Sequence, residues 1–125
     1  MYAAQQLEAY RTVQKTTESG REIDAMVLTR AALKLAEVQS NWNAPDREEN
    51  LDEALRFNQK IWSIFQGEML KEDNPLPRQL RADILSLSAF IDKRIIEAMS
   101  FPAPEKLNVI KNINLNIAAG LRGQS

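Results

Sequence analysis

The sequence of 125 residues contains no cysteine and no histidine. Their absence excludes disulfides, thiolate nucleophiles, histidine general bases and serine-histidine-aspartate triads, together with the usual ligands of zinc and haem. Carboxylate metal sites in helical bundles usually draw on Glu-x-x-His pairs, which cannot be built without histidine. We therefore expect a protein that is not an enzyme and that uses no metal and no cofactor.

Glycine and long apolar runs are scarce as well. The four glycines are scattered, and none belongs to a glycine-rich loop between a strand and a helix, so nucleotide binding has no support. No apolar run approaches the roughly 18 residues that span a bilayer, and the N-terminus lacks a signal-peptide pattern. We expect no membrane insertion and a cytoplasmic location.

Neither sign of charge dominates, because 16 basic residues face 17 acidic ones and the net charge is −1. Nucleic-acid binding depends on a clustered positive surface that neutralises phosphates. Direct contact with nucleic acid is therefore not expected. The acidic stretch at Asp46, Glu48, Glu49, Asp52 and Glu53 is interpreted as a solvated helix start, where negative charge complements the helix dipole.

The composition that remains, 44% hydrophobic and 26% charged, is typical of one folded globular domain. Proline and glycine gather in short clusters near residues 19–20, 43–45, 73–77 and 100–104, with long segments between them. No segment alternates with period two, so a sheet has no support. These patterns predict an all-α fold, a compact bundle of about five helices that forms a single domain over residues 1–125.

The two ends of the chain are expected to hold least firmly. A first helix over about Ala4 to Thr16 carries only a narrow apolar stripe, formed by Leu7, Tyr10 and Val13. Residues 1–17 are therefore predicted to form a weakly attached N-terminal helix, and residues 123–125 a frayed tail.

Turn and capping residues predict where the other helices begin and end. Ser19 and Glu22 have capping-box spacing, so the second helix should start near Gly20 and run to about Trp42. The third is expected from about Asp46 to Leu70. The fourth should carry Pro77 in its first turn, and the last should begin near Pro104 and end in a glycine cap between Gly120 and Gly123.

Each of these four helices has one apolar face at helical spacing. The second carries Val27, Ala31, Leu35, Val38 and Trp42, and the third carries Leu51, Leu55, Asn58, Trp62, Phe65 and Met69. The fourth carries Leu80, Ile84, Leu87, Ile91 and Ile95, with Arg81 at the edge, and the last carries Leu107, Ile110, Ile113, Ile117 and Leu121.

Two amides, Asn58 and Asn114, lie within these apolar faces, where a buried amide is costly unless it finds hydrogen-bond partners. Two interpretations are open. Each amide pairs with a backbone carbonyl or with the other and fixes helix register, as one polar core residue does in coiled coils. Alternatively, both line a groove where a partner helix supplies the missing bonds. The same choice between core and interface applies to Trp62 and Phe65. Leu115, apolar on a polar face, is weak evidence of a contact surface.

Several of these residues also form a familiar pattern. The chain contains, in order, Ala9-Tyr10, Phe57-Asn58 followed by Trp62 and Phe65, Leu76-Pro77-x-x-Leu80-Arg81-Ala82-x-Ile84-x-Ser86-Leu87-x-x-Phe90, and Ile113-Asn114 with Gly120-Leu121. This order resembles the bacterial flagellar biosynthesis regulator FlaF over nearly the whole chain. Asn43 to Glu53 departs from that pattern in being longer and more acidic, so no function is transferred to it.

The resemblance implies a cytoplasmic protein that supports flagellin production and export, similar to a secretion chaperone that holds amphipathic flagellin segments before export. The alternative is a post-transcriptional regulator that acts on flagellin mRNA through the regulator FlbT. The positions implied for partner binding are Asn58, Trp62, Phe65, Arg81 and Asn114. In that role the two aromatic residues supply apolar area, the two amides satisfy polar groups of the cargo, and the arginine pairs with a carboxylate on the cargo or inside the bundle. An exposed apolar groove is equally compatible with a homodimer face.

Overall fold

The computed structural model describes residues 18–123 of the chain. They form four α-helices and a short 3₁₀ turn, namely α2 (Glu18–Ser40), α3 (Arg47–Met69), α4 (Arg78–Ser100), η1 (Pro104–Lys106) and α5 (Leu107–Leu121). The described range contains no strand, which confirms the all-α prediction. The expected count of five helices is not reached, because the helix predicted over Ala4 to Thr16 lies outside the described residues. Most of the predicted frayed tail, residues 124–125, lies outside them too.

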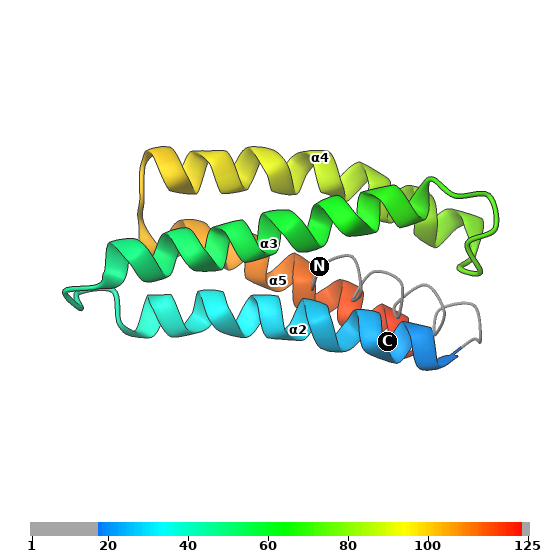
Figure 1. The fold of residues 1–125 in the computed structure, drawn as a ribbon, viewed down its shortest axis with the longest axis horizontal. Coiled ribbons are helices and arrows are strands. Elements are labelled where there is room, and N and C mark those ends of the chain that lie inside the picture. Colours follow the sequence, from blue (N-terminus) through cyan, green and yellow to red (C-terminus); the bar gives the residue numbers. More distant parts are fainter. Residues whose placement is uncertain (1–17, 124–125) are drawn as a thin grey trace, which may run out of the picture.

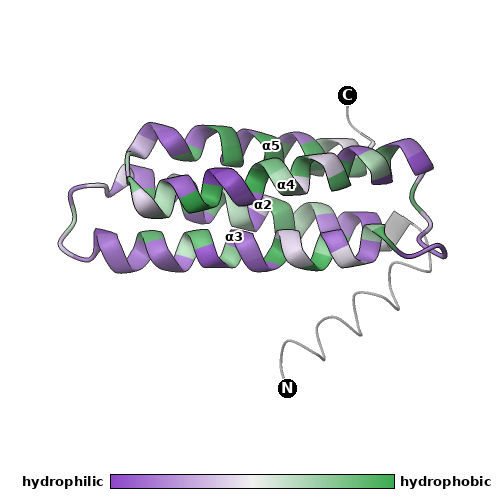
Figure 2. Ribbon diagram, turned by 90° about the horizontal axis from the view of Figure 1, so that it is seen from above, coloured by the Kyte–Doolittle hydropathy of each residue, from purple (hydrophilic) through white to green (hydrophobic). Residues whose placement is uncertain are grey.

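The four helices form an elongated antiparallel bundle (Figure 1). In it α2 lies beside α3 and α5, and α4 lies beside α3, so α2 and α4 occupy opposite corners. The helices are not packed equally closely, since α5 runs close to α2 along most of its length but approaches α4 at few points. The turns at both ends of the bundle carry hydrophilic residues (Figure 2).

The helix boundaries differ in detail from the predicted ones. The second helix begins at Glu18, so Ser19 lies inside it rather than at its N-cap. Pro77 precedes α4 as its N-cap, with an extended ψ of 143°, and does not occupy the first turn as predicted. The cause is the turn before Pro77. There the Leu76 amide N–H donates to the Asn74 side-chain oxygen at 2.9 Å, and the chain enters α4 in an extended conformation.

The end of α5 has the predicted glycine cap. Gly123 has a φ of +77°, a conformation that favours glycine, and its amide donates to the Gly120 carbonyl at 3.1 Å. The start of α5 is less regular than predicted, because the 3₁₀ turn occupies the positions from Pro104 before the α-helix begins at Leu107.

The core confirms the apolar faces, most completely on α3. All six members of the α3 stripe are buried. On α2, burial extends to a second side that the predicted stripe omits, formed by Ala25 and Ala32, and to Leu28 at the edge of the stripe, seven residues before Leu35. The reason is that α2 has two close neighbours and must bury a face toward each.

Small side chains explain the close approach of α2 and α5. Ala25 and Ala32 on α2 and Ala118 on α5 are almost completely buried, and such residues let two backbones come near each other. Polar bonds fix the pair at both ends: Gln39 donates to Asn108 at 2.8 Å, and Arg122 pairs with Glu22 at 3.1 Å. Together these contacts set the antiparallel register of α2 against α5.

Candidate functional site

A chain of buried hydrogen bonds crosses the middle of the bundle. The Trp62 indole N–H donates to the Asn114 side-chain oxygen at 2.8 Å, and the Asn114 amide donates to the Asn58 side-chain oxygen at 2.6 Å. The Asn58 amide then donates to two backbone carbonyls, Ala54 at 2.8 Å and Ala31 at 3.2 Å. We call Asn58, Trp62 and Asn114 the amide network.

The amide network joins three helices. Asn58 and Trp62 come from α3, Asn114 comes from α5, and the carbonyl of Ala31 belongs to α2. All three side chains of the network are almost completely inaccessible to solvent. A hydrogen bond in such a dry setting is strong and the loss of one partner is costly, so the network fixes the register of α2, α3 and α5.

Phe65 packs against this network. Its ring lies 6.2 Å from the Trp62 ring at an interplanar angle of 84°, an edge-to-face contact. Four of the five residues predicted for partner binding are thus brought together in the core. The structure has the first of the two arrangements considered for the amides, in which they pair with each other and with backbone. A partner-binding role for these residues stays a prediction.

Arg81, the fifth predicted site residue, lies apart from the others at the junction of α3 and α4. Its guanidinium donates to the Met69 carbonyl at 3.1 and 3.3 Å and to the Lys71 carbonyl at 2.7 Å. These carbonyls end α3, where backbone acceptors lack intrahelical partners and a positive charge is favourable. Arg81 therefore caps α3 from α4 in this structure.

The contact between α4 and α5 is looser than the rest of the core. Arg81 faces α3. Phe90 comes nine residues later, which is about half a turn round the helix, so it faces the side of α5. Because Arg122 faces α2, Ile113, nine residues earlier, faces the side of α4 by the same geometry. Antiparallel helices joined by a short turn place these two sides against each other.

We call this region the α4–α5 seam, formed by Leu87, Phe90, Val109, Ile113 and Ile117. Four of its members are half-buried and pack against the core, and the fifth, Phe90, is 40% exposed. The sequence pattern treats Leu87, Ile113 and Ile117 as core positions. They are only half-buried because α4 does not approach α5 closely enough to cover them.

Charged side chains border the seam on α4. Arg94, one turn after Phe90, lies with its guanidinium 5.2 Å from that ring and 2.9 Å from the Glu97 carboxylate. Its Nε is buried and has no hydrogen-bond partner within the part of the chain that the structure describes. Phe101, on the same side of α4 and 72% exposed, has Lys106 over its ring at 5.5 Å. The seam thus combines apolar surface, exposed aromatic rings and an unused donor.

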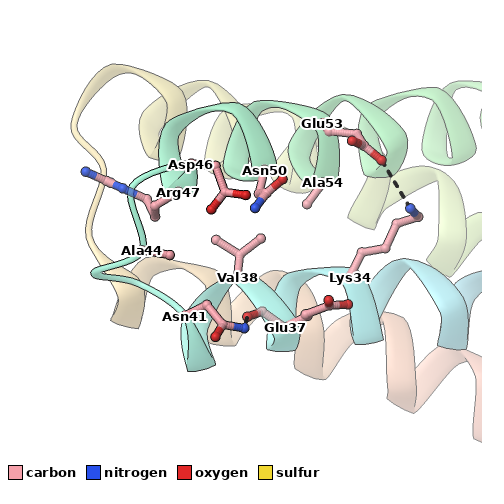
Figure 3. Close-up of a pocket in the computed structure, with 10 residues that line it drawn as sticks. All are labelled: Lys34, Glu37, Val38, Asn41, Ala44, Asp46, Arg47, Asn50, Glu53 and Ala54. Atoms are coloured by element: carbon pink, nitrogen blue, oxygen red, sulfur yellow. Dashed lines mark hydrogen bonds and ion pairs between the residues drawn. The ribbon is translucent and has the colours of Figure 1, made fainter.

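A cleft lies between α2 and α3 near the turn that joins them (Figure 3). This cleft has a volume of about 500 Å³ and mixes charges of both signs. It is lined by Lys34, Glu37, Val38, Asn41, Ala44, Asp46, Arg47, Asn50, Glu53 and Ala54. Lys34 and Glu53 bridge it at 3.5 Å. The five acidic residues between Asp46 and Glu53 are exposed, as predicted for a solvated helix start.

Comparison with known families shows to which family the chain belongs. A model of the family described as flagellar protein FlaF matches residues 6–121. The chain belongs to the FlaF family. Membership in FlaF places the protein in flagellar biology and confirms the resemblance. No curated protein and no solved structure matches the chain.

The FlaF match includes the amide network, Arg81, the α4–α5 seam and also the acidic stretch from Asn43 to Glu53. Among residues 18–123, no helix is long and apolar enough to cross a membrane. Within the same range, no group of three or more acidic side chains is placed to hold a metal ion.

Sequence reasoning did not select the seam of this FlaF protein as a site. A signal was present, because Phe90 lies about 100° away from the buried line through Ile91 and yet is aromatic. Phe101 gave a similar signal, since it follows α4 within a proline-rich turn. Neither residue fits the apolar stripe, and large aromatics off the stripe are candidates for an interface.

Proposed function

We propose that this FlaF-family protein is a flagellin-binding chaperone and positive regulator of flagellin synthesis, which holds amphipathic segments of flagellin in the cytoplasm before export. Family membership supports the flagellar context. The observation that carries the proposal is the α4–α5 seam, where half-buried aliphatic side chains lie with the exposed Phe90 ring and with the Arg94 Nε, which has no hydrogen-bond partner within residues 18–123.

The seam suits an amphipathic helix as its occupant. Such a segment lays its apolar face into a groove through anchors spaced three and four residues apart. Leu87 and Phe90 on the side of α4 toward α5, with Ile113 and Ile117 on the side of α5 toward α4, offer apolar surface along about two helical turns. A backbone carbonyl or carboxylate of the cargo would accept from the Arg94 Nε, which removes the cost of that buried unpaired donor.

The division of contacts within the bundle lets the seam widen without unfolding. The amide network ties α2, α3 and α5 together and includes no side chain of α4. The hydrogen bonds from Arg81 hold α4 to α3 at one end of the bundle. A small displacement of α4 from α5 therefore exposes more of Ile113 and Ile117 while the network stays intact.

A chaperone must also release its cargo, which favours moderate affinity. In interfaces a few aromatic anchors carry most of the binding energy. Phe90 is the anchor with the best position, because it borders the seam and is partly exposed before binding.

The test is size-exclusion chromatography with light scattering of this protein, alone and mixed with flagellin from the same organism. The proposal predicts a stoichiometric complex that is lost when the terminal segments of flagellin are removed. Phe90→Ser should raise the dissociation constant at least about tenfold, the size expected of a hot-spot anchor. Ile96→Ser is the matched control, because Ile96 is exposed on the other side of the same helix, and this variant should bind like the parent.

If no complex forms under any condition, the proposal fails, and regulation of flagellin mRNA through FlbT takes its place. If a complex forms and folded Phe90→Ser binds as tightly as the parent, the seam is not the binding surface. Asn58→Leu and Trp62→Ala test the role predicted from the sequence for the buried residues. Weaker binding by variants that stay fully folded would support that role.

A further inference from the structure

The outer face of α2 exposes large apolar residues that the proposed function does not use. Met26 and Leu33, seven residues apart and therefore on the same side of the helix, are 58% and 61% exposed. On α5, Leu115 is 41% exposed. The antiparallel register set by Gln39 with Asn108 and by Glu22 with Arg122 puts Leu115 at the level of Leu33.

The charges on this face form a specific pattern. Along α2 the exposed side runs Met26, Arg30, Leu33 and Glu37, so a positive and a negative charge flank the central leucine. Neither Arg30 nor Glu37 has an ion-pair partner within residues 18–123. We call Met26, Arg30, Leu33, Glu37 and Leu115 the α2 face.

The surface between these exposed residues carries small side chains. Thr29 and Ala36 on α2 and Ala119 on α5 are small and half-buried, and the Arg122 guanidinium reaches the Thr29 hydroxyl at 3.4 Å. A flat strip of this kind, with an apolar centre, allows another helix to approach closely.

We propose that the α2 face binds a second copy of the same chain, with the two α2 helices antiparallel about a two-fold axis at Leu33. A two-fold interface is isologous, so residue i meets residue j and j meets i. With Leu33 on the axis, Arg30 of each copy lies beside Glu37 of the other. The dimer therefore forms two ion pairs between charges that have none within residues 18–123 of a single copy.

Other arrangements of two copies satisfy the face less well. A two-fold axis at Met26 would set Arg30 against Glu22, which Arg122 already holds at 3.1 Å. A parallel arrangement in the same register would place arginine on arginine and glutamate on glutamate, which costs free energy. The charge pattern therefore selects the antiparallel register at Leu33.

The contact is small for a permanent dimer. Stable interfaces bury about 800 Å² per partner, and one helix face with a single flanking leucine offers less. The dimer should therefore be in equilibrium with the monomer and depend on concentration. This inference does not depend on flagellin binding, since the α2 face and the α4–α5 seam lie on different helix pairs.

Sedimentation velocity over a concentration series of the full chain tests the proposal. The parent mass should rise from 14.2 kDa toward twice that value as the concentration increases. Arg30→Glu and Glu37→Arg should each weaken the dimer at least about tenfold, because each reversal sets two pairs of like charges together. The double variant with both reversals restores both pairs and should dimerise like the parent.

Lys60→Glu is the matched control, because Lys60 is an exposed cation on α3, away from the α2 face. It should dimerise like the parent. Circular dichroism checks that every variant is folded. The proposal is overturned if the parent stays monomeric up to its solubility limit, if the single reversals dimerise as tightly as the parent, or if the folded double variant remains monomeric.

Discussion

Removal of the buried Asn114 amide is expected to destabilise the fold far more than removal of the exposed Asn112 amide on the same helix. Asn114→Ala takes away the acceptor of the Trp62 indole N–H and the donor to the Asn58 side-chain oxygen. Both groups lie where no solvent reaches them. The variant therefore leaves two buried polar groups without partners.

The magnitude follows from these two groups. Each unsatisfied buried donor or acceptor costs about 1 to 3 kcal/mol, and alanine returns about 0.5 kcal/mol through its higher helix propensity. The free energy of unfolding should fall by about 2 to 5 kcal/mol. Ordinary domains have about 5 to 15 kcal/mol in total, so the variant should remain folded but with little in reserve.

Urea unfolding followed by circular dichroism measures the change. With a slope of about 1.5 kcal/mol per molar, the midpoint should fall by about 1 to 3 M. Asn112→Ala is the control, because Asn112 is exposed on the same helix and gains the same propensity. Its midpoint should stay the same or rise slightly.

A double-mutant cycle isolates the hydrogen bond itself. Trp62→Phe alone leaves the Asn114 oxygen without its donor, whereas Trp62→Phe combined with Asn114→Ala leaves neither end of that bond unpaired. The double variant should lose at least about 1 kcal/mol less than the sum of the single losses. Additive losses, or an Asn114→Ala variant as stable as the parent, would show that the bond between Trp62 and Asn114 does not stabilise the fold.

Three further predictions concern contacts outside the amide network. Arg81→Ala removes the cap of α3 and should cost about 1 to 2 kcal/mol in urea unfolding, while Arg78→Ala, at an exposed position, should change stability by less than about 0.5 kcal/mol. Ala118→Leu overfills the contact between α2 and α5 and should cost about 1 to 3 kcal/mol, seen as a lower melting temperature, whereas Ala89→Leu on the exposed side of α4 should have little effect. Asn74→Ala removes the turn bonds to Leu76 and Glu68 and should cost about 1 kcal/mol in urea unfolding; an unchanged midpoint would show that this turn does not need its side chain.

The sequence predicts the core of α3 best because that stripe is regular and its helix packs on both α2 and α4. Every member of the stripe, from Leu51 to Met69, is buried. The apolar stripes single out the two amides that interrupt them, but the pattern leaves their hydrogen-bond partners open. Asn58 and Asn114 are 56 residues apart, and their hydrogen bond depends on how three helices come together, which local spacing does not contain.

For a related reason, the sequence does not predict how closely each pair of helices packs. Helical periodicity indicates which side of a helix is apolar but not how closely a neighbour covers it. Leu87, Ile113 and Ile117 therefore counted as core although they border the α4–α5 seam. The predicted stripe omits Ala25 and Ala32 for the opposite reason, since α2 buries two sides and the stripe describes one.

Hydrogen exchange with mass spectrometry, with and without flagellin, locates the cargo on the chain. Binding of flagellin in the α4–α5 seam predicts slower exchange in peptides that cover residues 85–96 of α4 and 109–117 of α5, with little change in α2. Protection confined to α2 or α3, or none in a sample where light scattering shows the complex, would contradict the assignment of the α4–α5 seam as the flagellin-binding surface.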